Sequence, residues 1–119
     1  MATVVHFEIP ADDVGRARTF YTELFGWKVE EFAGGGYWMI TTSGEKPVEG
    51  GMMARRHPRQ TITNYIDVAS VDQDSARVES LGGRVVVPKM AVKGMGYFAV
   101  CLDTEGNHFG LWEDDPGAE

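Results

Sequence analysis

The sequence predicts an α+β domain made of two tandem strand–helix–three-strand (βαβββ) units that form a curved sheet around a shared cavity. Three observations lead to this fold class. Strand-like and helix-like segments occur twice in the same order, similar residue pairs recur at a nearly constant offset, and a length of 119 residues fits one domain. We assign residues 3–54 to the first unit, 55–61 to a linker, 62–113 to the second unit and 114–119 to an acidic tail.

The first unit begins with residues 3–9 (TVVHFEI), which are rich in β-branched and aromatic residues and predict a strand that Pro10 ends. Asp12 or Asp13 is expected to cap the next helix, because an Asp oxygen accepts hydrogen bonds from first-turn amides. Gly26 is expected to end that helix in the left-handed conformation. Three more strands are predicted over residues 27–32, 37–42 and 50–54, with glycine-containing turns at 34–36 and 44–47.

The second unit shows the same order. Residues 63–68 predict a strand, and Ser70 or Asp72 is expected to cap a helix that runs to about Leu81 and is ended by Gly82 and Gly83. The remaining strands are predicted at 84–87, ended by Pro88, at 97–102 and at 108–113, with a turn at 104–107 and a loose tail after the last strand.

The repeat itself is visible in matched residues. The matches are Glu8-Ile9 with Asp67-Val68 and Gly51-Met52-Met53 with Gly110-Leu111-Trp112 at an offset of 59, and Gly36-Tyr37-Trp38 with Gly96-Tyr97-Phe98 at 60. Several matches in order, close to one offset, indicate duplication.

Composition excludes several classes of function. The net charge is −7, and an acidic surface repels nucleic-acid phosphates and anionic lipid, so we expect neither partner. No segment has the pattern of a signal peptide, and no apolar run approaches the roughly 20 residues of a membrane span. The single cysteine, Cys101, cannot form an intrachain disulfide, and a reducing cytoplasm is the expected location.

The chain resembles the vicinal oxygen chelate superfamily of glyoxalase I, bleomycin-resistance proteins and extradiol dioxygenases. The motifs that carry the resemblance are VHFEIPADD (5–13), FYxxLFGW (20–27), the glycine pair 50–51, LGG (81–83) and DTEGNHFGLWE (103–113). They are most similar to the bacterial branch related to lactoylglutathione lyase, although Thr104 replaces the usual proline. The resemblance implies that each βαβββ unit forms half a barrel, that active sites lie between units, and that a homodimer completes them.

The resemblance also implies metal-ligand positions on the first and last strand of each unit. His6 matches the first of them, but the two last-strand positions fall on Gly51 and Gly110, and the remaining one falls near Thr63 or Tyr65. Zn, Ni or Fe sites need three or four converging ligands, so no metal cofactor is expected. A non-standard site remains an alternative, with ligands drawn from His6, Glu8, Asp67 and His108.

The two glycines are expected to leave space in the cavity. Aromatic and methionine side chains close to them in sequence suit a small aromatic or apolar ligand. The candidate ligand-binding residues are Gly51, Gly110, Trp38, Met52, Tyr97, Phe98 and Trp112, with Tyr37 and Met53 nearby.

A catalytic function is the main alternative to ligand binding. His6 and Glu8 share a strand face, and a carboxylate beside an imidazole raises its pKa and fixes its tautomer. With the Tyr65 hydroxyl as a hydrogen-bond donor, they could move a proton next to a carbonyl, as a lyase or isomerase related to glyoxalase I does. A third hypothesis is a module that mainly dimerises.

The linker contains the one cationic cluster, Arg55-Arg56-His57-Pro58-Arg59. It is either a solvated connection between the halves or a contact for a carboxylate or phosphate group of the ligand.

Overall fold

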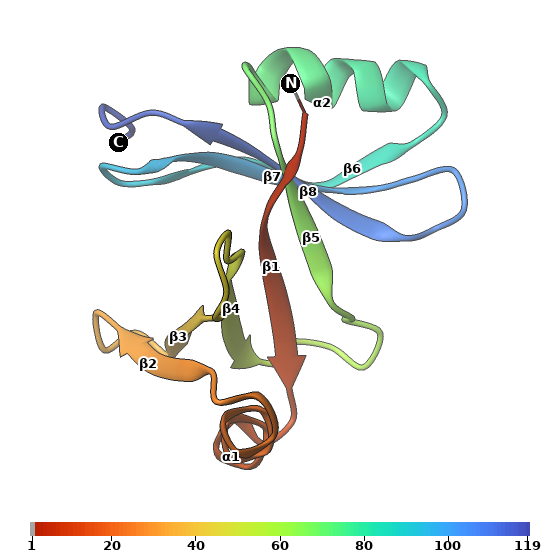
Figure 1. The fold of residues 1–119 in the computed structure, drawn as a ribbon. Helices are drawn as coiled ribbons and strands as arrows, with labels where there is room; N and C mark the ends of the chain where they lie inside the picture. The colour runs from red at the N-terminus through yellow and green to blue at the C-terminus, as the bar shows by residue number, and fades with distance from the viewer. Residues whose placement is uncertain (1) are drawn as a thin grey trace. The chain divides into compact units, whose positions relative to one another are not determined.

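The computed structural model describes residues 2–119, which form eight strands and two helices and confirm the predicted α+β class (Figure 1). The chain divides into two compact units. One, here called the N-terminal unit, is His6–Ile62, and the other, the C-terminal unit, joins the residues up to Val5 with Thr63–Glu119. The first strand contributes to both, because its opening residues belong to the C-terminal unit.

The N-terminal unit has one helix and four strands. These are β1 (Val4–Ala11), α1 (Val14–Phe25), β2 (Lys28–Phe32), β3 (Tyr37–Thr41) and β4 (Glu49–Ala54). The strands lie in the order β2-β3-β4-β1, where β1 and β4 are parallel and the other neighbours are antiparallel. This sheet is open, with β2 at its outer edge.

The C-terminal unit repeats the pattern with β5 (Thr63–Asp67), α2 (Val71–Ser80), β6 (Arg84–Val92), β7 (Gly96–Leu102) and β8 (His108–Asp114). Its strands lie in the order β5-β8-β7-β6, with β5 and β8 parallel. The backbone amide of Asp67 also donates to the carbonyl of Thr3 at 2.8 Å, which ties the start of the chain to this unit.

The helix caps follow the sequence closely. The Asp13 side chain accepts from the Arg16 amide and caps α1, and Gly26 ends the helix with a φ of 72°. Such a cap stabilises a helix by roughly 0.5–2 kcal/mol. The Ser70 hydroxyl caps α2 by accepting from the Gln73 amide.

Two prolines do not end strands as the sequence analysis predicts. Pro10 lies inside β1, where the carbonyl of the next residue, Ala11, accepts from the Arg55 amide. Backbone groups alternate in direction along a strand, so the missing N–H of Pro10 points away from β4 and breaks no bond of that ladder. Pro88 lies inside β6, an edge strand whose pairing with β7 is irregular around Val87, and edges and bulges are where strands tolerate proline.

One face of each sheet is covered by its own helix. In the N-terminal unit the buried residues Ile9, Val29, Ile40 and Met52 pack with partly buried side chains of α1. In the C-terminal unit Val71 of α2 packs on Ala99, Cys101 and Leu111. Burial raises the pKa of the Cys101 thiol to about 11, so it stays protonated at neutral pH and is a core side chain.

The acidic tail is not loose, contrary to the prediction. The amide of Asp115 donates to the Met95 carbonyl at 3.0 Å, and the carbonyl of Ala118 accepts from Gly94 at 2.8 Å. The Ala118 side chain is buried. A small apolar residue near the end gives the tail a packing site that its charge does not reveal.

The strand registers correct two of the sequence matches between the halves. Tyr37 lies opposite Met53, and Phe98 lies opposite Trp112, the repeat partner of Met53. The structural counterpart of Tyr37 is therefore Phe98, and the match with Tyr97 is wrong by one residue. Because side chains alternate between faces, that single step moves the side chain to the opposite side of the sheet.

The match between Glu8 and Asp67 is also wrong. Glu8 lies opposite Gly51 and Tyr65 lies opposite Gly110, so Tyr65 is the counterpart of Glu8. By the same register, Thr63 is the counterpart of His6. Aligning the two halves in this way requires a gap in the alignment between their first strands, and the sequence around the linker does not show where to place it.

Candidate functional site

The candidate site lies on the face of the N-terminal sheet opposite α1. Strand alternation sends Phe7 and Ile9 of β1 toward the helix-side core, and His6 and Glu8 to the other face. The same face, here called the His6 face, also receives Tyr37 of β3 and Gly51 of β4, as the strand registers require.

The Tyr37 hydroxyl joins His6 to Glu8. It lies 2.8 Å from Nε2 of His6 and donates to Oε2 of Glu8 at 2.9 Å. The rings of His6 and Tyr37 are nearly parallel, with centroids 6.5 Å apart. His6 and Glu8 share a face as the sequence predicts, and a hydroxyl from another strand connects them.

The hydrogen positions in this set follow from counting donors. The Tyr37 hydroxyl has one hydrogen, which points at Glu8, so its oxygen accepts a hydrogen bond from His6. Nε2 of His6 therefore carries the imidazole hydrogen. The two consecutive hydrogen bonds run from His6 through the Tyr37 hydroxyl to the Glu8 carboxylate. These three side chains form a polar group that can accept hydrogen bonds from a ligand or transfer a proton.

Gly51 makes room for this arrangement. A Cβ at this position would lie 1.8 Å from the Tyr37 hydroxyl oxygen and 2.1 Å from the ring carbon that bears it. The neighbouring Gly50 leaves room for a ring on the opposite face of the sheet, where a Cβ would lie 2.5 Å from the Phe7 ring. The glycine pair thus lets two aromatic rings lie directly on β4.

The protonation of His6 differs from the sequence expectation. Burial lowers the pKa of the His6 imidazole below its usual value, and the carboxylates of Glu8 and Glu49 only partly offset this. Glu8 does raise the pKa of His6 as expected, but desolvation of the imidazolium cation lowers the pKa by more. His6 is therefore neutral at pH 7.

A pH dependence of stability follows from the lowered pKa of His6. Above the unfolded pKa of about 6.5 both states are neutral, and below it the unfolded chain binds a proton that the folded chain resists. The free energy of unfolding should therefore fall as pH decreases from 7 to 5.5, with a slope within the one-proton limit of about 1.4 kcal/mol per pH unit. Urea unfolding of the wild type and His6→Gln measures this, and the variant should show a flatter dependence. Equal slopes would contradict a lowered His6 pKa.

The residues do not fit the metal site that the resemblance implies. Within residues 2–119, no three His, Cys, Asp or Glu side chains gather closely enough to hold a metal ion. His6 is engaged by Tyr37, and a ligating side chain at position 51 would collide with the tyrosine ring. The first-strand position of the second unit is Thr63, which is a poor ligand for Zn, Ni or Fe.

The predicted ligand-binding residues of the N-terminal unit lie on two faces. Gly51 is on the His6 face, whereas Met52 is fully buried in the helix-side core. Trp38 packs on that same core, and the guanidinium of Arg18 lies 4.7 Å from its ring centroid. The structure therefore places Trp38 and Met52 away from His6.

The C-terminal unit divides its predicted residues in the same way. Tyr97 packs on the α2 side and carries the Lys89 ammonium 4.3 Å from its ring centroid. The opposite face, here called the Tyr65 face, holds the others. By strand register these are Tyr65, Asp67, Phe98, His108, Gly110 and Trp112.

The space expected at Gly110 is filled, as it is at Gly51. A Cβ at Gly110 would lie 2.1 Å from Cδ1 of Tyr65, whose side chain is buried and packs edge-on to Phe98. The prediction that the paired glycines leave empty space is therefore wrong. Tyrosines from different strands, β3 in one unit and β5 in the other, cover them.

Tyr37 is the member of the candidate site that the sequence did not assign to His6. The sequence places it near a glycine gap among aromatic residues, and nothing local marks it as the link between His6 and Glu8. That link depends on the β3–β4 register, which the intervening loop sets and local periodicity does not reveal.

The chain resembles known proteins in family, in sequence and in fold. Residues 3–43 match the family model described as the bleomycin resistance protein-like N-terminal domain. The anthracycline biosynthesis protein DnrV of Streptomyces peucetius is 30% identical over 89% of this chain and 45% of its own length. The chain thus spans less than half of this curated relative.

Solved structures share the fold at low sequence identity. A glyoxalase/bleomycin resistance protein/dioxygenase superfamily member from Vibrio splendidus superposes with a TM-score of 0.72 at 15% identity, covering 97% of this chain and 100% of its own. Methylmalonyl-CoA epimerase from Mycobacterium tuberculosis superposes with a TM-score of 0.65 at 17% identity, covering 95% and 88%.

Proposed function

Because the chain belongs to the vicinal oxygen chelate superfamily, we propose that it binds a small aromatic or apolar organic molecule without a resident metal ion. The observation that carries this proposal is the hydrogen-bonded set His6–Tyr37–Glu8 on the His6 face. It supplies a few convergent polar groups, and the partly exposed Met39 on the same face supplies polarisable apolar contact.

The relatives support the aromatic character of the ligand. DnrV is named for anthracycline biosynthesis, and an anthracycline is built on a flat, fused-ring quinone with phenolic hydroxyls. Phenolic hydroxyls are good hydrogen-bond donors, and the Glu8 carboxylate at the end of the chain of hydrogen bonds is a strong acceptor. We therefore propose a planar, hydroxylated aromatic ligand.

A second function is favoured by the state of His6. A neutral imidazole can accept a proton, and the Tyr37 hydroxyl connects it to the Glu8 carboxylate, so the set could move a proton next to a carbonyl. Exchange of such a proton for deuterium, lost in His6→Gln, would favour this lyase or isomerase function over binding alone.

Assembly and location are part of the proposal. We propose a homodimer, because the resemblance to the vicinal oxygen chelate superfamily implies that active sites lie between βαβββ units and that a second copy completes them. A cytoplasmic location is consistent with the single, buried cysteine. Within residues 2–119, neither helix is long and apolar enough to cross a membrane.

The test is binding of a dihydroxyanthraquinone, followed by quenching of tryptophan fluorescence. We expect saturable binding by the wild type and about tenfold weaker binding by Tyr37→Phe, since a hydrogen bond to a charged group contributes about 1.5–3 kcal/mol. The matched control is Tyr21→Phe, which removes a hydroxyl from the α1 side of the same unit. Absence of saturable binding, or equal affinity of Tyr37→Phe and the wild type, would contradict the proposal.

A further inference from the structure

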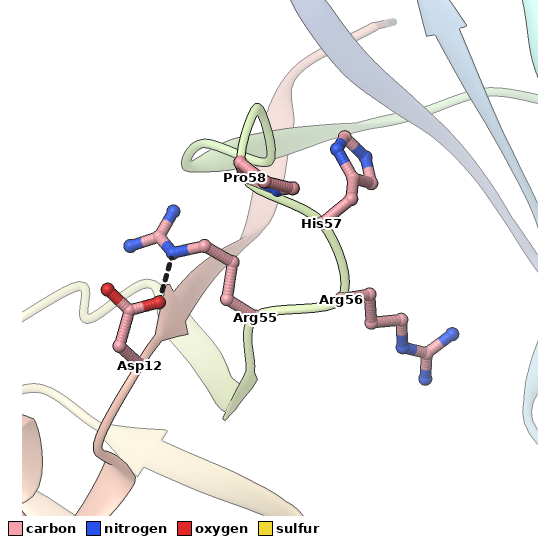
Figure 2. A pocket seen from close by; sticks show the side chains of 5 residues that line it. All are labelled: Asp12, Arg55, Arg56, His57 and Pro58. Atoms are coloured by element: carbon pink, nitrogen blue, oxygen red, sulfur yellow. Dashed lines mark hydrogen bonds and ion pairs between the residues drawn. The ribbon is translucent and has the colours of Figure 1, made fainter.

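The cationic segment after β4 is an ordered loop whose shape is set by its first arginine. The Arg55 side chain donates to Oδ1 of Asp12 at 2.9 Å (Figure 2). It also donates to the Gln60 carbonyl and, at 3.5 Å, to the Pro10 carbonyl. Its backbone amide donates to Ala11 at 2.9 Å. Arg55 is therefore a structural residue that fixes the loop to the end of β1.

Three more hydrogen bonds close the loop on itself. The Gln60 side chain accepts from the Arg56 amide at 2.7 Å, and the Gln60 amide donates to the His57 carbonyl at 3.0 Å. The Arg59 amide donates to Nδ1 of His57 at 3.3 Å. A freely solvated linker would not need this network, and its side chains would not be held in fixed directions.

The bond to Nδ1 also decides the tautomer of His57. Because Nδ1 accepts a hydrogen bond, the hydrogen of the neutral ring lies on Nε2. The exposed edge of the ring is therefore a hydrogen-bond donor. Figure 2 shows the His57 and Arg56 side chains both extending away from the Arg55–Asp12 pair, and in different directions from the loop.

The loop around the exposed edge of the His57 ring carries positive charge that nearby carboxylates only partly neutralise. Three of the chain's 11 Lys and Arg residues lie within five positions here, and Asp12 neutralises Arg55. Within the described part of the chain, the guanidinium groups of Arg56 and Arg59 form no ion pair, and both residues are exposed. Asp12, Arg55, Arg56, His57 and Pro58 line a shallow surface depression.

We propose that this loop binds an oxyanion, either a phosphate or a carboxylate group, at a site separate from the His6 face. Arg56 and His57 both line the depression. A guanidinium can contact two oxygens of such a group, and Nε2 of His57 is available there as a third donor. Arg59 adds positive charge from the same loop. The network around Arg55 fixes the loop backbone, and the bond to Nδ1 fixes the His57 ring, before the anion arrives, which lowers the entropic cost of binding.

The experiment is an NMR titration of the full chain with inorganic phosphate and, separately, with acetate, against sodium chloride at equal ionic strength. We expect phosphate or acetate, but not chloride, to shift amide signals of residues 55–60. Arg56→Ala with Arg59→Ala should weaken the affinity at least tenfold, as loss of charge-assisted hydrogen bonds predicts. His57→Gln, which keeps a side-chain N–H donor, should bind more tightly than His57→Ala.

The matched control is Lys46→Ala with Lys93→Ala, which removes the same charge from exposed positions elsewhere. Phenyl phosphate distinguishes the source of the anion, since tighter binding than inorganic phosphate indicates the anionic end of a larger organic molecule, and equal binding indicates a free anion. Either result supports the site. Absence of localised shifts, or equal weakening by the arginine and lysine pairs, would overturn it.

Discussion

Replacing Met52 with alanine is expected to lower the free energy of unfolding by about 2–5 kcal/mol, because it leaves a cavity in a well-packed core. The Met52 side chain is fully buried and packs with Ile9, Val29 and Ile40 on the α1 side of the sheet. Met52→Leu, which nearly conserves volume, is expected to cost less than about 1.5 kcal/mol. Urea unfolding measures both.

The control for Met52 is Met95→Ala, whose side chain is 48% exposed and which should change stability by no more than about 0.5 kcal/mol. The same variants test the assignment of Met52 as a ligand contact. If Met52→Ala were stable and bound dihydroxyanthraquinone more weakly, Met52 would be a ligand contact, and its role in the core would be contradicted.

Gly110→Ala is expected to destabilise the protein by about 1–3 kcal/mol through overpacking. The new Cβ would lie 2.1 Å from Cδ1 and 2.7 Å from Cγ of Tyr65, so the whole ring must move and not only its end. Tyr65 is only 6% exposed, which leaves the ring little space to move into. Thermal or urea unfolding measures the loss.

A double-mutant cycle assigns this cost to the tyrosine. In a Tyr65→Ala background, Gly110→Ala should cost much less, because the colliding ring is gone. Gly35→Ala is the matched glycine control, since its φ is not positive and its Cβ would meet no atom closer than 4.0 Å. If Gly110→Ala and Gly35→Ala were equally stable, the ring would not lie over Gly110.

The two tyrosines explain why the paired glycines do not mark an empty pocket. Gly51 and Gly110 hold equivalent positions in the two units, and at each of them the absent side chain is replaced by a ring from a neighbouring strand. At Gly51 that ring also brings a hydroxyl to His6 and Glu8. The glycine at position 51 is thus required for the polar site, because a Cβ there would occupy the place of the Tyr37 hydroxyl.

Much of the fold follows from local sequence. The sequence narrows each helix cap to two candidates and identifies the stop at Gly26, because caps and stops satisfy hydrogen bonds or backbone geometry within a few residues. The structure selects Asp13 and Ser70 as the caps. The ends of β1 and β6 are not recognisable in this way. Whether a strand tolerates Pro10 or Pro88 depends on which neighbour it pairs with and on which side, and this is a property of the assembled sheet.

By itself, the sequence determined two βαβββ units, the places where their helices begin and the common face of His6 and Glu8, because alternation and capping act over a few residues. Only the tertiary structure decided that Tyr37 joins these two side chains, that tyrosines cover both glycines, and that Glu8 corresponds to Tyr65. These features depend on register between strands that are distant in sequence, where a shift of one residue exchanges the faces of the sheet.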